Sequence, residues 1–442
     1  MTKGTGVIFG AGSVGRGFIG QIFSMSGLEV VFADIDTEII TALNRDGKYP
    51  HFTLSDSSRE RREIGPVRAI YSTDSEAVNA AILNADIIAT SVGAAVLPRI
   101  APALAAGLAL RMERGRPPVN ILLCENLHDC AAHMRSYLKQ HLPAEYAARL
   151  DAEVGLLETS IGRMIPVITP ELRAIHPAAI SVEPYMFLPY DAAAEVGSMP
   201  TITGLIADTS VPFSFYVNRK LYLFNMGHAT CAWLGEILGL KFVWQAIARP
   251  DIYHFVRAAM LEIALALAKH YSTPVAPLID HVDDLLYRFG NHATADTVER
   301  VGRDPERKLA ASDRMFGAYR LAVETGMPRR YLAIALAAGL ARLSRERDAV
   351  GSSAACAEGV TYDEKATSSE VAVPASVCAV LRERMQHPDV GEPEYERILA
   401  LTALLIKSYD ANRVSGGSVV DSFPFHELIE LISADFACSN II

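Results

Sequence analysis

The fold is decided by residues 5–15, which read Thr5-Gly6-Val7-Ile8-Phe9-Gly10-Ala11-Gly12-Ser13-Val14-Gly15. The first five residues form a short apolar run typical of a strand, and three glycines follow in a GxGxxG spacing. A helix is predicted from Val14 to Ser26, where apolar residues recur at helical spacing, and Gly27 ends it. A second apolar run, Leu28 to Ala33, predicts another strand, which ends in Asp34. Strand, glycine loop, helix, strand and acid thus occur in order within one βαβ length.

Each part of this segment suits the binding of a dinucleotide. Gly10 permits a tight turn, Gly12 lets a pyrophosphate approach the backbone, and Gly15 lets the helix pack closely on the strand. The helix N-terminus offers free N–H groups to the phosphates. Asp34 lies nineteen residues after Gly15, where a carboxylate accepts hydrogen bonds from a ribose diol and repels a 2′-phosphate. We therefore predict NAD as the cofactor, bound by Gly10, Ala11, Gly12, Ser13, Val14, Gly15 and Asp34.

Arg16, directly after the loop, has two interpretations. It either contacts phosphate or is a solvated helix residue. Both stay open from the sequence.

Two further apolar runs place polar residues at the end of predicted strands. Residues 86–90 precede Ser91-Val92-Gly93, and residues 119–124 precede Glu125-Asn126. Because ligands bind at the carboxyl ends of parallel strands, we expect Thr90, Ser91, Val92 and Gly93 near the nicotinamide ribose. Asn126 is either a ligand-facing residue at the same edge or the N-cap of the next helix.

The chain is predicted to have two domains of different class. An α/β Rossmann-type NAD-binding domain covers residues 1–198. From residue 199 to 442 long segments of helical apolar pattern dominate, which predicts an all-α substrate and catalytic domain. Within it, residues 345–373 are rich in Ser, Ala, Gly and charge, and we interpret them as an exposed, mobile loop.

The predicted helical domain contains a run with three polar residues among apolar ones: Lys220, Asn225 and His228. At about 100° per residue, Asn225 lies about 140° and His228 about 80° from Lys220, so that all three share one side of a helix. A buried lysine loses its proton more readily than a free one. The run therefore favours a site that handles the proton of an alcohol. Alternatively, Lys220 begins a solvated helix, and Asn225 and His228 are satisfied core residues.

Composition limits the classes of partner. The 442 residues carry a formal net charge of −10, which gives no general attraction to nucleic acid or to anionic membranes. The six cysteines and twelve histidines show no metal-ligand spacing, so we expect no metal and a cytoplasmic protein with reduced thiols. No uncharged apolar run approaches the length of a membrane span. Charge and composition suit a monomer and a homodimer equally.

Several motifs resemble those of the mannitol dehydrogenase family, the long-chain polyol-specific dehydrogenases. They are residues 9–20, Thr90-Ser91-Val92-Gly93, Cys124-Glu125-Asn126, Lys220-x4-Asn225-x2-His228 and residues 301–309. The resemblance implies an NAD-linked, metal-independent interconversion of a polyol and its ketose. By the same resemblance, Lys220 is the general base, Asn225 and Asn126 hold the carbinol oxygen, and His228 hydrogen-bonds the substrate.

The substrate is the least determined part. Arg303, Arg307 and Lys308 form a basic cluster that suits a sugar phosphate, although it also reads as a solvated helix start beside Asp304 and Glu306. Where the family pattern leads us to expect Asp-Arg, this chain has Gly162-Arg163. The protein then recruits another acid, for which Glu158 is a candidate, or prefers a different substrate. Three hypotheses remain: a polyol-phosphate dehydrogenase, a dehydrogenase of a free polyol or uronate, and an NAD-binding sensor without turnover.

Overall fold

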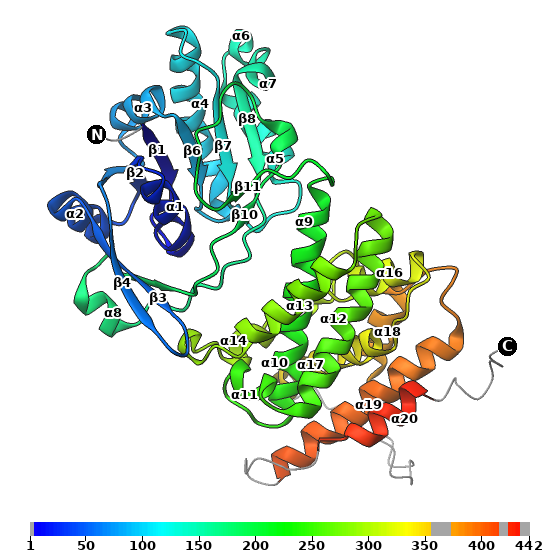
Figure 1. Cartoon of the computed structure of the whole chain (residues 1–442). Helices are drawn as coiled ribbons and strands as arrows, with labels where there is room; N and C mark the ends of the chain where they lie inside the picture. Colours follow the sequence, from blue (N-terminus) through cyan, green and yellow to red (C-terminus); the bar gives the residue numbers. More distant parts are fainter. Residues whose placement is uncertain (1–3, 355–372, 415–422, 434–442) are drawn as a thin grey trace. The chain divides into compact units, whose positions relative to one another are not determined.

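The chain forms two compact units, Met1–Val217 and Asn218–Ile442, in a computed structural model that describes residues 4–354, 373–414 and 423–433 (Figure 1). The first unit extends beyond residue 198, where we expected it to end. The reason is that β10 (Leu188–Pro189) pairs in parallel with β11 (Leu205–Ile206). Ile202, between them, is buried in the same core as the main sheet. The segment after residue 198 therefore completes the first unit.

The first unit is built on a six-stranded sheet in which every neighbouring pair is parallel. Its strands are β1 (Thr5–Phe9), β2 (Glu29–Asp34), β5 (Val67–Tyr71), β6 (Ile87–Thr90), β7 (Val119–Leu123) and β8 (Val154–Glu158). They lie in the order β5-β2-β1-β6-β7-β8, so the direction of winding reverses between β1 and β6. This is the strand order of the Rossmann fold, and the reversal is where such sheets bind ligands. The predicted Rossmann-type domain is confirmed.

Helices cover both faces of this sheet (Figure 1). One face packs against η1 (Gly15–Ile19), α1 (Gly20–Met25) and α2 (Thr37–Asp46). The other packs against α3 (Ser75–Asn84), α4 (Leu97–Glu113) and α5 (Cys130–His141). Strand residues alternate between the two cores: Ile8 belongs to the first, and Val7 and Phe9 to the second. The predicted helix after the glycine loop is confirmed, and its first turn, η1, is a π-helix.

Short elements complete the first unit. A three-stranded sheet joins β3 (Tyr49–Leu54), β4 (Arg59–Ile64) and β9 (Ile180–Val182) in the order β4-β3-β9. The remaining α-helices are α6 (Ala144–Ala147), α7 (Leu150–Glu153) and α8 (Pro170–Ile175), and two 3₁₀ turns are η2 (Ala94–Val96) and η3 (Ala192–Ala194). One segment, Ala94–Glu113, is long and apolar enough to cross a membrane, but half of its apolar window is buried within the protein. It contains α4, whose apolar side chains form part of the core beside the sheet.

Every regular element described after Asn218 is a helix, as predicted. The chain enters through α9 (Ser214–Arg219), η4 (Lys220–Asn225) and α10 (Met226–Ile237). There follow α11 (Val243–Ile247), α12 (Pro250–Tyr271), α13 (Ala276–Phe289), α14 (Val298–Gly302), α15 (Pro305–Lys308), α16 (Phe316–Glu324), α17 (Arg330–Ala354), α18 (Ala375–Arg384), α19 (Glu392–Val414) and α20 (Phe425–Ser433).

The core of the second unit surrounds α10. Trp233 of α10 is fully buried, and its indole N–H donates to the carbonyl of Gly302 at 2.9 Å. The hydroxyl of Tyr409, on α19, donates to the carbonyl of Trp233 at 3.2 Å. The segment after residue 345 thus supplies helices to this core.

The loop predicted for residues 345–373 is wrong for its first part, because α17 continues to Ala354. Two contacts hold this part of the helix. Arg345 lies over the ring of Tyr409 at 4.3 Å, and Arg347 forms an ion pair with Glu306 at 2.8 Å. Residues 355–372 lie outside the described residues.

Candidate active site

The glycine loop between β1 and η1 has the shape that a pyrophosphate requires. Gly10 has a φ of +100°, which glycine adopts without strain. A Cβ on Gly15 would lie 2.0 Å from the carbonyl oxygen of Gly10, so no side chain fits there. A Cβ on Gly12 would meet no atom within 4 Å. The exposed backbone at Gly12 and Ser13 therefore has room for a phosphate at the start of the helix.

Asp34 lies at the edge of this loop. Its Oδ2 accepts a hydrogen bond from the Ala11 N–H at 2.5 Å, and its Oδ1 accepts one from the Ile35 N–H at 2.7 Å. The carboxylate thus holds the end of β2 against the glycine loop. Its position at the end of the second strand fits the ribose of a dinucleotide.

Arg16 fits neither interpretation drawn from the sequence. Its side chain is buried, with Nε donating to the Ala11 carbonyl at 2.6 Å and one guanidinium nitrogen 3.3 Å from the Ala179 carbonyl. Burial lowers the pKa of Arg16 from its usual value. The residue is a structural support beneath the loop, and its guanidinium is directed to backbone carbonyls.

Thr90, Ser91, Val92 and Gly93 lie directly beside the glycine loop. The Ser91 hydroxyl donates to the Gly10 carbonyl at 3.0 Å. Because this bond joins the loops that follow β1 and β6, the residues predicted to contact the cofactor from these two strands are brought together at the switch point.

Glu125 anchors the loop after β6, a role that sequence reasoning missed. Its carboxylate accepts from the Thr90 hydroxyl at 2.6 Å and from the Val92 N–H at 3.1 Å. Burial raises the pKa of Glu125, although these hydrogen bonds oppose the shift. The sequence did offer one signal for this role, an acid that follows a strand whose residues are all apolar or buried, β7.

Asn126 follows Glu125 in a bend after β7 and is exposed. Helix α5 begins at Cys130, and its N-cap position is Asp129. The alternative prediction, that Asn126 caps this helix, is therefore wrong. Asn126 stays at the carboxyl edge of the sheet, where the substrate hypothesis needs it.

Lys220 begins a π-helical turn. η4 continues α9 into α10, and Lys220 and Asn225 are its first and last residues. The Met226 N–H bonds to the Leu221 carbonyl, five residues back, so the helix carries an extra residue per turn here. The spacing of 100° per residue that we used for Lys220 and Asn225 does not hold through such a turn. Single π-turns of this kind occur frequently at functional sites.

The environment of Lys220 lowers its proton affinity. Burial, with a smaller contribution from the charge of Arg314, lowers the pKa of Lys220 to about 8. Arg314 is itself buried and pairs with Asp313 at 2.8 Å. Lys220 is half-buried, which does not fit a fully solvated helix start, and a group with a pKa of about 8 exchanges its proton close to that pH.

His228 lies one turn further along, on α10, in an aromatic stack. Its ring lies 4.8 Å from Phe289 and 5.6 Å from Phe224, nearly parallel to both. Its Nε2 is 3.2 Å from Oδ2 of Asp296, a buried residue that sequence reasoning missed. Burial raises the pKa of Asp296, but His228 and Arg300 outweigh it and hold this pKa below its usual value.

The three residues predicted to bind a phosphate have different partners in this structure. Lys308 is buried, and its ammonium group donates to the backbone carbonyls of Val301 and Arg303. Burial lowers the pKa of Lys308 to about 7, with Arg314 adding to the shift. The Arg303 side chain is 70% exposed and lies 3.9 Å from Asp304, whereas Arg307 lies 3.6 Å from Asp313. In this structure the Lys308 ammonium group caps the end of α14.

The structure also bears on whether Glu158 replaces the acid expected at position 162. A Cβ on Gly162 would lie 3.4 Å from the ring of Tyr185, so the tyrosine packs close to the place of the expected aspartate. Glu158 Oε1 accepts from the Ala131 N–H at 2.8 Å and thus supports the start of α5. Glu158 already has a structural partner in the first unit.

Within the described ranges, no group of three or more His, Cys, Asp or Glu residues is placed to hold a metal ion. The described residues offer a glycine loop suited to a dinucleotide and Lys220, whose pKa is lowered to about 8.

Comparison with protein families identifies the chain. The model of the mannitol dehydrogenase Rossmann domain matches residues 5–204, and that of the mannitol dehydrogenase C-terminal domain matches residues 213–396. The chain belongs to the mannitol dehydrogenase family. The resemblance seen in the motifs is confirmed, and the chain is a dehydrogenase of this family.

Similar proteins include two bacterial enzymes. Mannitol-1-phosphate 5-dehydrogenase of Bacillus licheniformis is 35% identical over 335 residues, which is 75% of this chain and 86% of that protein. The enzyme of the same name from Brevibacillus brevis is 33% identical over 336 residues, or 76% of this chain and 85% of its own.

Solved structures share the fold across both units. Mannitol 2-dehydrogenase of Pseudomonas fluorescens, in a ternary complex with NAD and D-mannitol, superposes with a TM-score of 0.67 at 17% identity, covering 99% of this chain and 95% of its own. A substrate-free D-sorbitol dehydrogenase also has a TM-score of 0.67, at 16% identity and with 98% and 92% coverage. These likenesses extend the family fold beyond residue 396.

Proposed function

We propose that this chain is an NAD-dependent dehydrogenase that interconverts D-mannitol 1-phosphate and D-fructose 6-phosphate, with Lys220 as the general acid and base. The observation that carries the choice of substrate is the 33–35% identity with two mannitol-1-phosphate 5-dehydrogenases over three quarters of the chain. The lowered pKa of Lys220 supports the catalytic role.

The proton chemistry follows from Lys220. Oxidation of a secondary alcohol requires its hydroxyl proton to leave, and a base with a pKa near the working pH transfers it most effectively. A pKa of about 8 leaves part of the Lys220 population neutral at pH 7. In the direction of ketose reduction the protonated lysine returns the same proton. NAD, when bound, supplies the hydride chemistry.

Asn225, Asn126 and His228 hold the substrate in this proposal. Amide N–H groups stabilise the charge that develops on the carbinol oxygen, as in an oxyanion hole. This arrangement needs no metal ion, and we propose that the reaction is metal-independent. His228 hydrogen-bonds a substrate hydroxyl, while Asp296 fixes the orientation of its ring.

NAD in preference to NADP is supported by Asp34. A carboxylate at the end of β2 accepts hydrogen bonds from the ribose diol and repels a 2′-phosphate. The room above Gly12 fits the pyrophosphate, and the loop from Thr90 to Gly93 lies beside it.

Arg288 is a better candidate for the substrate phosphate than Lys308. It is buried in α13, and its guanidinium lies 5.6 Å from the ring of Phe224, which stacks on His228. Burial, with smaller contributions from the charges of Arg219 and Arg288, lowers the pKa of His281 to about 3. A guanidinium group beside the Phe224–His228 stack suits a phosphate dianion.

A free polyol or a uronate is the second candidate. It is favoured by the different partners of Arg303, Arg307 and Lys308, because Lys308 is bound to backbone carbonyls. In this alternative Arg288 binds a carboxylate or is structural. A sensor without turnover is the least supported, because the proposed base retains a shifted pKa.

We further propose that the enzyme works in the cytoplasm, as a monomer or homodimer, on a small-molecule substrate and without nucleic acid or membrane partners. The net charge of −10 supports this, as do the free cysteines among the described residues, Cys124, Cys130, Cys231 and Cys378.

The test is NADH oxidation with fructose 6-phosphate, fructose and fructuronate in parallel. We expect turnover with fructose 6-phosphate and a large rise in KM for it in Arg288→Ala, with little change in the KM for NADH. Turnover with the unphosphorylated ketoses alone would refute the phosphate assignment. Binding of NADH without turnover on any of the three would favour the sensor.

A further inference from the structure

The helix after the glycine loop begins with a π-turn whose carbonyl groups bond to side chains from other elements. This turn, η1, contains one residue more than an α-helical turn, because the N–H at its end bonds to a carbonyl five residues back. The hydroxyl of Tyr49, on β3, donates to the carbonyl of Arg16 at 2.7 Å. Nη1 of Arg163 donates to the carbonyl of Gly17 at 3.0 Å. The turn is therefore held from outside the helix.

Arg163 connects this turn to two other segments of the first unit. Its side chain is buried, and Nη1 donates to the amide oxygen of Gln21 at 2.6 Å as well as to Gly17. Nε and Nη2 both donate to the carbonyl of Glu183, at 3.0 and 2.8 Å. The guanidinium also lies 5.2 Å from the ring centroid of Phe18, within the range of a cation–π contact. One buried side chain thus joins the loop after β8, the segment after β9 and the dinucleotide helix.

The carboxylate of Glu183 fixes the backbone next to Arg163. Glu183 is fully buried, and its Oε1 accepts a hydrogen bond from the Met164 N–H at 2.5 Å. The Glu183 N–H donates to the Met164 carbonyl at 3.3 Å. Because these bonds hold the two segments together, the backbone of Arg163 is fixed relative to the groups that its guanidinium binds. The planar fork of arginine then keeps its direction toward η1.

The position of η1 determines the position of the glycine loop before it. The Arg16 N–H donates to the Gly12 carbonyl at 3.1 Å, which joins the π-turn to the loop. A Cβ on Gly17 would lie 3.0 Å from Cγ1 of Val182, so the turn packs closely on β9. A displacement of η1 would therefore move the backbone at Gly12, where a phosphate is expected to approach.

We propose that Arg163 is a positioning residue for the dinucleotide, which holds the π-turn η1 and thereby the glycine loop that receives the pyrophosphate. The inference rests on the proposed binding of NAD at this loop, and it is independent of the ketose that the enzyme reduces. Arg163 acts through Gly17 and Gln21. Because the pyrophosphate is common to NADH and NADPH, the loss of Arg163 should weaken both cofactors alike, whereas Asp34 distinguishes between them.

The test combines calorimetric titration of NADH and NADPH with steady-state reduction of the ketose that the wild type accepts. Arg163→Met should raise the Kd and the KM for NADH about tenfold, the loss expected for hydrogen bonds to a charged group. The kcat at saturating NADH should stay within about twofold of wild type, because the change removes uniform binding. A purely structural defect would instead reduce the folded fraction, and with it kcat, and would leave the KM unchanged.

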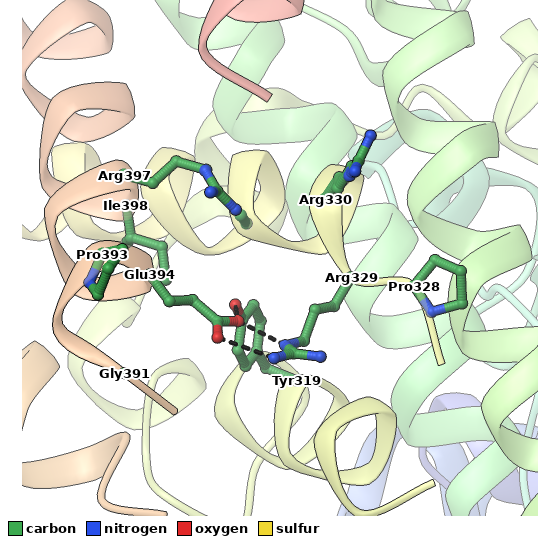
Figure 2. A pocket seen from close by; sticks show the side chains of 10 residues that line it. Tyr319, Pro328, Arg329, Arg330, Gly391, Pro393, Glu394, Arg397 and Ile398 are labelled. Atoms are coloured by element: carbon green, nitrogen blue, oxygen red, sulfur yellow. Dashed lines mark hydrogen bonds and ion pairs between the residues drawn. The ribbon is translucent and has the colours of Figure 1, made fainter. Parts of the chain in front are cut away.

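Two other buried arginines serve as matched controls. Arg111, on α4 at the opposite face of the sheet, donates to the carbonyls of Ile82 at 2.9 Å and Pro117 at 2.8 Å. In the helical unit, Arg329 forms a two-point ion pair with Glu394 on the wall of a pocket (Figure 2). Arg111→Met and Arg329→Met should both lower thermal stability and keep the wild-type KM for NADH.

Two milder variants test the same contacts with less risk to folding. Arg163→Lys keeps a cation and should recover part of the affinity for NADH. Tyr49→Phe removes only the hydrogen bond to the Arg16 carbonyl and should raise the KM for NADH about twofold or more.

Wild-type affinity for NADH in folded Arg163→Met would overturn the proposal, as would an equal rise in the KM for NADH in Arg111→Met. If Arg163→Met does not fold, wild-type affinity in both Arg163→Lys and Tyr49→Phe has the same consequence. If the wild type binds NADH but reduces no ketose, the proposed function fails, and the calorimetric comparison of the variants still decides the role of Arg163.

Discussion

Nε2 of His228 lies 3.2 Å from Oδ2 of Asp296, and this pair connects α10 with the loop before α14. Asp296 also pairs with Arg300 through its other oxygen. The imidazole is therefore held on one edge by a buried carboxylate and on its face by Phe289. Its second nitrogen, Nδ1, is the atom left for a substrate hydroxyl in the proposed mechanism.

Replacing Asp296 by Asn should lower kcat with fructose 6-phosphate about ten- to a hundredfold, because the imidazole loses its charged partner, an interaction of about 1.5–3 kcal/mol. The control is Asp283→Asn, which removes a half-exposed acid paired with Arg257 at 2.8 Å. Steady-state kinetics on both variants, with circular dichroism to verify folding, checks this. Equal kcat values in the two variants would show that Asp296 does not position the imidazole.

Glu125→Ala should weaken NADH binding, because it leaves the Thr90 hydroxyl and the Val92 N–H without their acceptor. An unsatisfied buried group costs about 1–3 kcal/mol, so the loop beside the glycine turn loses its fixed position. Glu158→Ala is the matched control, since Glu158 ends β8 and its carboxylate accepts a hydrogen bond from the Ala131 N–H at the start of α5. Fluorescence titration of NADH should separate the two variants. The same NADH affinity in both would contradict the positioning role.

Asp34→Ala should reduce affinity for NADH about tenfold or more, the effect of losing a charged acceptor. It should also narrow the preference for NADH over NADPH, because the repulsion of a 2′-phosphate is removed. Glu38→Ala is the control, because it also removes one acid close in the chain, in the first turn of α2, and should leave the affinity for NADH unchanged. Calorimetry measures both cofactors. Unchanged NADH affinity in Asp34→Ala would refute its contact with the ribose.

Glu262 should make the stability of the protein depend on pH. Burial raises the pKa of Glu262 to about 7 from a usual value of 4.5. Between these values the folded chain holds a proton that the unfolded chain releases, so stability falls as pH rises through this window. The difference of about 2.5 between these two pKa values corresponds to a loss of about 3 kcal/mol, at most, in the free energy of unfolding.

The measurement is urea unfolding of wild type and Glu262→Gln at pH 5 and pH 8. The variant cannot ionise at this position, so its stability relative to wild type should improve as pH rises. The exposed Glu76→Gln, in α3, should show no such change. Parallel pH dependence in wild type and Glu262→Gln would contradict the shifted pKa.

The Rossmann-type unit could be predicted because its signals are local. Strand, glycine loop, helix and acid follow one another within residues 5–34, and the observed β1, η1, α1 and β2 occupy the same stretch. The end of this unit could not be found in the same way, because the pairing of β10 with β11 is a tertiary contact without a strong pattern of its own.

The site was only partly visible in the sequence. Lys220 and His228 were predicted from their apolar surroundings, and their catalytic roles stay predictions. The π-turn that begins at Lys220 depends on a register of backbone hydrogen bonds that side-chain spacing does not encode. Asp296 was missed because it reaches His228 from a distant loop. A run of basic residues does not reveal that the ammonium group of Lys308 binds the carbonyls at the end of α14, and its contact with a phosphate stays a prediction.

The most direct test of the account is the pH profile of mannitol 1-phosphate oxidation by wild type and Lys220→Ala. Wild-type turnover should rise as pH increases through about 8, where Lys220 becomes neutral, and reduction of fructose 6-phosphate should show the opposite slope. Lys220→Ala should lose about 10²- to 10⁴-fold in kcat and the ionisation near pH 8, while still binding NADH. Wild-type turnover in Lys220→Ala, or an unchanged pH profile, would contradict the assignment of Lys220 as the acid and base.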